Sequence, residues 1–215
     1  MIASESIVCG ALAALLALGA PFSTVYTRLT EPGAYTASQS VAEYMQLPDY
    51  PAGCEPVSLC ILLESYEYEA SMPGIMDFFV RSQSDFVHAY WGSEYSEGAA
   101  YPPAVVEAAN RYLSEQGARI EARDITGTYW GTIEALIGEG KPVMCWVTVG
   151  YNWPIWSDFY SGDWRMYANE HCVVLYGLDG STAYVSDPLE GLIEVDAGTF
   201  ADVWIRCGSM AVFIE

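Results

Sequence analysis

The sequence predicts an α+β fold, in which helices come first along the chain and strands joined by short turns follow. Apolar residues recur at helical spacing in three segments, 54–66, 102–116 and 129–138. Beyond Gly140 the pattern changes to short apolar segments, which we expect to be strands: 142–149, 171–178, 182–186, 192–195 and 210–214. Helices followed by a run of strands indicate an antiparallel sheet packed against the helices.

The ends of these elements carry their own signals. Pro56 suits the first turn of a helix that begins at Cys54, because no backbone donor is needed there, and Glu55 suits the positive end of the helix dipole. Gly117 closes the second helix. The turns Asp179-Gly180 and Glu190-Gly191 separate the middle strands, as hairpins require.

Composition favours one folded domain and disfavours a polyanionic partner. The chain has 215 residues, of which 52% are hydrophobic and 14% aromatic, so it carries enough material for a single packed core. Its formal net charge is −20 at pH 7, which repels phosphate backbones. We therefore expect no nucleic-acid partner, and we expect a monomer.

The N-terminus predicts export. The run from Ile7 to Ala20 holds only apolar residues and glycine, so it carries no charge. The apolar character continues to Tyr26. We read residues 1–26 as a cleaved signal peptide or a membrane anchor, 27–40 as a linker and 41–215 as the folded domain. A buried hydrophobic helix is the alternative. Export implies an extracellular or cell-surface location, with membrane attachment if the segment is retained.

Cys54 differs from the other cysteines of the folded part. Cys60, Cys145, Cys172 and Cys207 lie in apolar stretches and are expected to be small buried hydrophobes. At a helix N-terminus, the thiolate of Cys54 would be stabilised by the dipole, which lowers a thiol pKa. A metal site built from Cys54, Cys60, His171 and Cys172 would lack the close paired spacings of zinc sites, so we expect no metal and no cofactor.

A thiol nucleophile needs a base and a group that orients the base. The chain offers His171 and His88, and we favour His171 because it opens an apolar strand, where an imidazole is costly unless it is hydrogen-bonded at a cleft. Asp187 follows 16 residues later, at the end of the next predicted strand. A hairpin can place it beside His171, where it would hold the imidazole tautomer.

Two further features predict contacts to a substrate. A turn ending in Gly53 leaves room for a substrate backbone beside Cys54. The segment 146–167 is rich in aromatic residues without a clean period, so we read it as a long loop. It either packs over the core or forms a wall of the cleft, and in the second case Trp153, Trp156 and Trp164 would contact the substrate.

These motifs resemble papain-like cysteine peptidases related to the bacteriocin leader peptidases, in their stand-alone branch. Gln46 lies ahead of the sequence Gly-Cys-Glu at 53–55, His171 begins the segment His-Cys-Val-Val-Leu-Tyr-Gly, and Asp187 lies in Val-Ser-Asp-Pro with Gly191 beyond. Gly-Lys-Pro-Val at 140–143 resembles the segment that leads into the intervening strand. The resemblance covers roughly 41–215, but the segment 67–127 matches no pattern of the family.

The resemblance implies a papain-like fold, in which a central N-terminal helix carries the cysteine and packs on a C-terminal antiparallel sheet. It implies a triad of Cys54 as nucleophile, His171 as base and Asp187 as orienter, with Gln46 and the backbone N–H of Cys54 binding the oxyanion. We therefore expect an exported cysteine peptidase that acts on a peptide or protein. An amidase or acyltransferase with the same triad, or an inert peptide-binding protein on this fold, remain alternatives.

Overall fold

The computed structural model describes residues 34–35 and 41–215 of the chain. Contacts divide the chain into two units, Met1–Ala34 and Tyr35–Glu215. The first unit takes in the predicted export segment, residues 1–26, and residues 27–34 of the predicted linker. Strand β1 (Ala34–Tyr35) spans the boundary between the two units in the sequence. Residues 1–26 lie outside the described part, so their prediction stays a prediction. None of the helices in the described ranges has the length and apolar character that crossing a membrane requires.

A large, mostly C-terminal sheet forms the centre of the second unit. Its strands follow the order β11-β10-β9-β6-β12-β5, and each strand in this order is antiparallel to its neighbours. The central strands β9 and β6 have almost wholly buried side chains, because helices cover both faces. The strand bounds are β5 Ala122–Asp124, β6 Val143–Thr148, β9 Glu170–Asp179, β10 Thr182–Asp187, β11 Gly191–Asp196 and β12 Ala211–Ile214.

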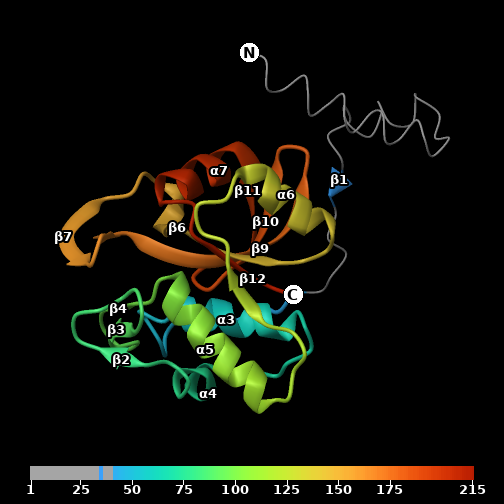
Figure 1. Ribbon diagram of the computed structural model, residues 1–215. Helices are drawn as coiled ribbons and strands as arrows, with labels where there is room; N and C mark the ends of the chain where they lie inside the picture. The colour runs from blue at the N-terminus through green and yellow to red at the C-terminus, as the bar shows by residue number, and fades with distance from the viewer. Residues whose placement is uncertain (1–33, 36–40) are drawn as a thin grey trace, which may run out of the picture. The chain divides into compact units, whose positions relative to one another are not determined.

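The helices form two layers around this sheet (Figure 1). Helices α3 (Cys54–Glu64) and α5 (Pro102–Glu115), with the short α4 (Met72–Met76), lie on one side, and α6 (Trp130–Gly138) and α7 (Ala197–Arg206) lie on the other. Helix α3 is the central one, and its side chains are buried all round from Cys54 to Leu63. The Ser58 hydroxyl donates a hydrogen bond to the Cys172 carbonyl at 2.8 Å, which ties α3 to β9.

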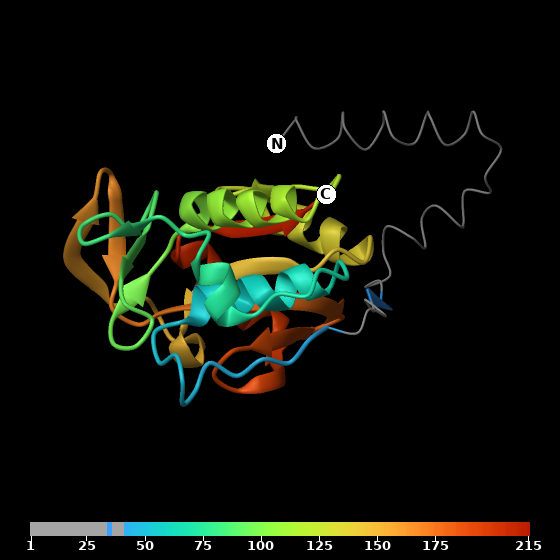
Figure 2. The ribbon, with the colours of Figure 1, turned by 90° about the horizontal axis from the view of Figure 1, so that it is seen from below.

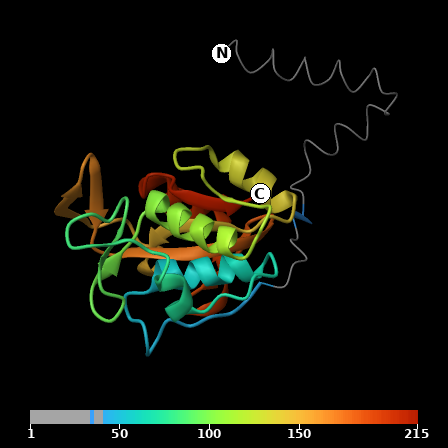
Figure 3. The same cartoon turned by 60° about the horizontal axis from the view of Figure 1, so that its bottom comes forward.

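Two small sheets lie at one end of the large sheet, and two views show them side by side (Figures 2 and 3). One is a sheet of β2 (Arg81–Ser82), β3 (Tyr90–Gly92) and β4 (Gly98–Ala99). The other is a hairpin of β7 (Trp156–Ser161) and β8 (Trp164–Tyr167), which follows the 3₁₀ turn Val149–Tyr151. The ring of Phe159 in the hairpin packs against Trp91 at 4.9 Å between centroids.

The α+β fold is as predicted, and each of the three predicted helices and five predicted strands has a counterpart within a few residues. Several elements were missed, among them α4, β2–β5, α7 and the β7–β8 hairpin. Helix α7 lies between two predicted strands, where Asp196 caps it by accepting a hydrogen bond from the Thr199 N–H at 2.7 Å. The segment expected as a long loop contains the β7–β8 hairpin, whose alternating half-exposed pattern was masked by aromatic residues on both faces.

Candidate active site

The start of helix α3 places Cys54 at the edge of a cavity. Gly53 is the N-cap, and its carbonyl accepts the Val57 N–H at 3.0 Å. The turn before it is held from the small sheet, because the Tyr90 hydroxyl donates to the Ala52 carbonyl at 2.5 Å and the Ala52 N–H donates to the Glu94 carbonyl at 3.1 Å. The position of Cys54 is thus fixed by the first helical hydrogen bond of α3 on one side and by the small sheet, which holds the preceding turn, on the other.

Gly53 is required for close packing, which corrects the prediction that it leaves room for a substrate. A Cβ atom at this position would lie 2.9 Å from Tyr50 Cβ and 2.9 Å from Met72 Cε. The missing side chain therefore points into the protein, and Gly53 is not among the residues that line the cavity. Its glycine lets the turn pass tightly beneath Tyr50.

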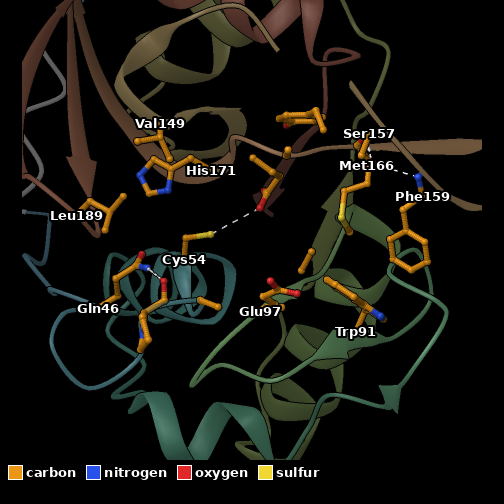
Figure 4. Close-up of a pocket in the computed structure, with 17 residues that line it drawn as sticks. Gln46, Cys54, Trp91, Glu97, Val149, Ser157, Phe159, Met166, His171 and Leu189 are labelled. Carbon is orange, nitrogen blue, oxygen red and sulfur yellow. Dashed lines mark hydrogen bonds between the residues drawn. The ribbon is translucent and has the colours of Figure 1, made fainter. Parts of the chain in front are cut away.

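The thiol of Cys54 lies between two carboxylates. Its Sγ atom is 3.3 Å from Oε2 of Glu55 and 3.8 Å from Oε2 of Glu170, the contact drawn as a dashed line from Cys54 in Figure 4. Burial, followed by the charges of Glu170 and Glu55, raises the pKa of Cys54 well above its ordinary value. The prediction of a lowered pKa is therefore wrong for this structure, because it considered only the helix dipole.

Both carboxylates are themselves perturbed. Burial raises the pKa of Glu55 to about 7, although the Ala100 N–H, which donates to its Oε1 at 2.5 Å, works in the opposite direction. Burial and the charge of Glu55 raise the pKa of Glu170 well above its ordinary value. The Oε1 atom of Glu170 is buried without a hydrogen-bond partner in the described part of the chain. Glu55 is also buried, rather than exposed at the helix end as a dipole-stabilising surface acid would be.

His171 and Asp187 form a buried pair across two adjacent strands. His171 lies near the start of β9 and Asp187 at the end of β10, and His171 Nε2 is 2.7 Å from Asp187 Oδ1. Both side chains are only 2% exposed. Burial favours the neutral acid, but the hydrogen bonds from His171 and from the Leu189 N–H outweigh it, so the pKa of Asp187 lies below its ordinary value. The predicted spacing of 16 residues thus brings the two side chains together.

With Nε2 engaged by Asp187, the Nδ1 atom of His171 is the ring nitrogen left for other partners. Figure 4 shows the His171 ring and the Cys54 thiol at the same end of the cavity. Within residues 41–215, the hydrogen bonds of the Cys54 thiol go to Glu55 and Glu170, and none joins it to His171. The structure therefore places the two predicted residues at one cavity without a hydrogen bond between them.

Gln46 is buried beside Cys54. Its backbone N–H donates to the Pro188 carbonyl at 2.8 Å, which ties it to the segment after Asp187. Its side-chain Nε2 donates to the Pro51 carbonyl at 2.9 Å and therefore has a second hydrogen for another acceptor. The backbone N–H of Cys54 lies in the first helical turn, where the helix itself supplies no acceptor. Two donors consequently lie at the same end of the cavity.

The cavity has a volume of about 570 Å³, within the range of ligand sites in proteins. The start of α3, the small β2–β4 sheet, the β7–β8 hairpin and the start of β9 enclose it, together with residues outside these elements that include Gln46 and Leu189. Among its described lining residues, no lysine or arginine is present, whereas Glu97 and Glu170 are acidic. Figure 4 shows Trp91 and Phe159 at the end of the cavity away from His171.

The three tryptophans predicted to contact a substrate do not line this cavity. Trp153 is 67% exposed and its ring lies 4.2 Å from the Arg206 guanidinium, while Trp156 packs on Tyr167 and Trp164 on Tyr101. The assignment of these rings to the cleft wall is thus corrected, since Trp156 and Trp164 pack on aromatic residues of the domain and Trp153 lies before the hairpin, against Arg206. Other members of the same segment line it instead, namely Val149, Ser157, Phe159, Met166, Tyr167 and Ala168.

Sequence reasoning missed Glu170, although it directly precedes His171. The signal was weak, because its contact with Cys54 spans 116 residues and no local pattern predicts it. Trp91 and Glu97 were missed because they lie in the segment 67–127, which carried no recognised pattern.

A helix that begins with a cysteine, packed on an antiparallel sheet that carries a His–Asp pair, defines a papain-like protein. A family model confirms the class, since residues 38–212 match the Peptidase_C39 like family. The chain belongs to this family, as the sequence motifs predicted. No curated protein matches the chain.

Two solved structures share the fold. The chain is similar to a protein from Bacillus anthracis assigned as a C39-like peptidase, with a TM-score of 0.73 and 22% identity, over 83% of this chain and 96% of that one. It is also similar to the peptidase domain of Streptococcus ComA, a bi-functional ABC transporter of a quorum-sensing pathway, with a TM-score of 0.51 and 17% identity, over 81% of this chain and 98% of that one. At these identities the comparisons support the papain-like fold.

Proposed function

We propose that the protein is a cysteine peptidase that cleaves peptide bonds through an acyl-enzyme at Cys54. The observation that carries this proposal is the convergence on one cavity of a helix-start thiol and a buried imidazole whose far nitrogen is bonded to a carboxylate. Family membership supports the same chemistry. Cys54, His171, Asp187 and Gln46 take the four roles that acyl transfer requires.

In the first half of the reaction, His171 takes the proton of the Cys54 thiol as the sulfur attacks the carbonyl carbon of the substrate. The oxyanion that forms accepts hydrogen bonds from the Cys54 N–H and from Gln46 Nε2. The C–N bond then breaks, His171 returns the proton to the leaving amine, and a thioester remains on Cys54.

In the second half, water attacks the thioester and His171 takes its proton. Collapse of the second tetrahedral intermediate releases a carboxylic acid and restores the thiol. Asp187 holds Nε2–H of His171 throughout, so that Nδ1 stays available for the proton. The carboxylate stabilises the imidazolium that forms in each half.

The test is hydrolysis of a mixed peptide pool by the full chain, with a reductant and a chelator present and products identified by mass spectrometry. We expect new peptide ends in the wild type and none in Cys54→Ala. Cys60→Ala is the matched control, since Cys60 is buried in the same helix and does not line the cavity. Cleavage that survives Cys54→Ala contradicts the proposal. Products joined to an added amine would indicate an acyltransferase, and binding without any product would indicate an inert peptide-binding protein.

Export is a separate part of the proposal, supported by the charge-free apolar run from Ile7 to Ala20. N-terminal sequencing of the protein recovered from the medium and from the membrane fraction of expressing cells tests it. A new N-terminus near Ala20 indicates a cleaved signal, and an intact N-terminus in the membrane fraction indicates an anchor. Intact protein confined to the cytosolic fraction contradicts export.

A further inference from the structure

The carboxylates around Cys54 have no role in the acyl-enzyme steps, yet together with its sulfur they form a group of three potential metal ligands, the only group of this kind among the described residues. One sulfur or oxygen atom from each of Cys54, Glu55 and Glu170 lies within 4.8 Å of both others. These residues come from the start of α3 and the start of β9, so the group is built from two rigid elements.

A second observation points to a missing partner at this place. Oε1 of Glu170 is buried and has no hydrogen-bond partner, although buried carboxylate oxygens nearly always have one. The described residues that line the cavity include no lysine or arginine that could pair with it. The site thus gathers three acidic groups, each a potential metal ligand once deprotonated, with no lysine or arginine beside them in the described lining of the cavity.

The orientation of the second carboxylate is also fixed. Glu55 uses Oε1 to accept the Ala100 N–H at 2.5 Å, which leaves Oε2 directed at Cys54. Ala100 is held in turn, because its carbonyl accepts the Trp146 indole N–H at 3.1 Å. Hydrogen bonds that orient a ligating group from behind are typical of protein metal sites.

We propose that Cys54, Glu55 and Glu170 form a binding site for a divalent transition-metal ion of the zinc type, and that the bound ion reversibly inhibits the protein. One thiolate with two carboxylates suits zinc, whereas calcium and magnesium prefer oxygen ligands alone. On binding, the Cys54 thiol and any protonated carboxyl of the pair release their protons to solvent, and the sulfur and carboxylate oxygens donate lone pairs to the ion. The inhibitory part rests on the proposed peptidase function, because it requires that this same sulfur be the nucleophile.

The site is tested by titrating the reduced, metal-free full chain with Co²⁺, which reports a thiolate ligand through ultraviolet charge-transfer absorption. We expect this absorption in the wild type, its loss in Cys54→Ser, and displacement by one equivalent of Zn²⁺ but not by excess Mg²⁺. Glu170→Gln should weaken Co²⁺ binding by at least about tenfold. Glu97→Gln is the matched control, because Glu97 lines the cavity outside the cluster, and it should bind like the wild type.

Absence of the thiolate band, its persistence in Cys54→Ser, or wild-type affinity in Glu170→Gln would each overturn the site. Circular dichroism shows whether each variant is folded. If Cys54→Ser does not fold, the Co²⁺ affinity of Glu170→Gln still decides whether the site exists. Peptide hydrolysis gives the second readout. The Zn²⁺ concentration that inhibits the wild type should be at least about tenfold lower than the concentration that inhibits Glu170→Gln. A cobalt band without any hydrolysis overturns only the peptidase proposal, and hydrolysis without a band overturns only the metal site.

Discussion

Replacing Glu170 with glutamine should make the Cys54 thiol more reactive, although it leaves the cysteine, the histidine and the aspartate in place. The carboxylate lies 3.8 Å from Cys54 Sγ. At an effective dielectric constant of about 20, one negative charge at this distance raises the free energy of the thiolate by about 4 kcal/mol. That energy corresponds to a change of about three in the thiol pKa.

The measured change should be smaller, because the carboxylate is itself easily protonated. Burial and the charge of Glu55 raise the pKa of Glu170, so it is charged for only part of the pH range in which Cys54 ionises. We therefore expect Glu170→Gln to lower the pKa of Cys54 by about one, which means about tenfold more thiolate at any pH below that pKa. The glutamine amide can also donate a hydrogen bond to the thiolate, which acts in the same direction.

The assay is the rate at which limiting iodoacetamide alkylates Cys54, followed by mass spectrometry between about pH 6 and pH 9 with a chelator present. The profile of Glu170→Gln should be displaced toward lower pH, and that of the control Glu97→Gln should coincide with the wild type. An unchanged profile in Glu170→Gln would refute the reasoning that the charge of this carboxylate opposes the thiolate. A profile displaced toward higher pH would show that the carboxylate assists ionisation.

Three further predictions concern other contacts of the same domain. Asp187→Asn should lower kcat for peptide hydrolysis by at least about 100-fold with little change in KM, because the amide no longer holds the productive His171 tautomer; a fall in KM alone would argue against this role. Glu55 has a pKa of about 7 in the folded protein against 4.5 ordinarily, so the folded state binds its proton more tightly. The free energy of unfolding should therefore fall by up to about 3 kcal/mol as the pH rises from 4.5 to 7. Urea titrations of Glu55→Gln should not show this fall, and a fall that persists would contradict the assignment. Asn110 exchanges two hydrogen bonds with the backbone of Ala122, at 2.7 and 3.1 Å, so Asn110→Leu should destabilise the protein by about 1–3 kcal/mol in the same titrations without changing the alkylation rate of Cys54.

Local signals were sufficient where a residue's environment is set by its neighbours along the chain. The start of α3 could be predicted because Pro56 and the glycine before Cys54 are both signals of a helix start. The His171–Asp187 pair could be predicted because a hairpin converts sequence spacing directly into proximity. In both cases the structure depends on segments of fewer than about twenty residues.

Local signals failed where tertiary contacts decide the environment. The hairpin of β7 and β8 has aromatic residues on both faces because one face packs against the segment around Phe86 and Trp91, and this removes the simple alternation of a strand. Similarly, the tryptophans of the hairpin could not be placed without knowing which face turns toward the cavity. The contact of Glu170 with Cys54 depends on how α3 lies across β9, which no single segment encodes.

The energies involved explain why the helix dipole does not determine the state of Cys54. A charge at a helix end gains about 0.3–1 kcal/mol, and up to about 2 kcal/mol when it is partly buried. Burial of the sulfur opposes the thiolate most, and the carboxylate at 3.8 Å, when it is charged, costs the thiolate about twice that upper value. Cys54 therefore rests as a thiol, and the proposed mechanism requires His171 to remove its proton during attack on the substrate, when the developing oxyanion has donors to bind it. A substrate that displaces the carboxylate of Glu170 from the sulfur would ease the same step, so the reactivity of Cys54 should depend on what fills the cavity.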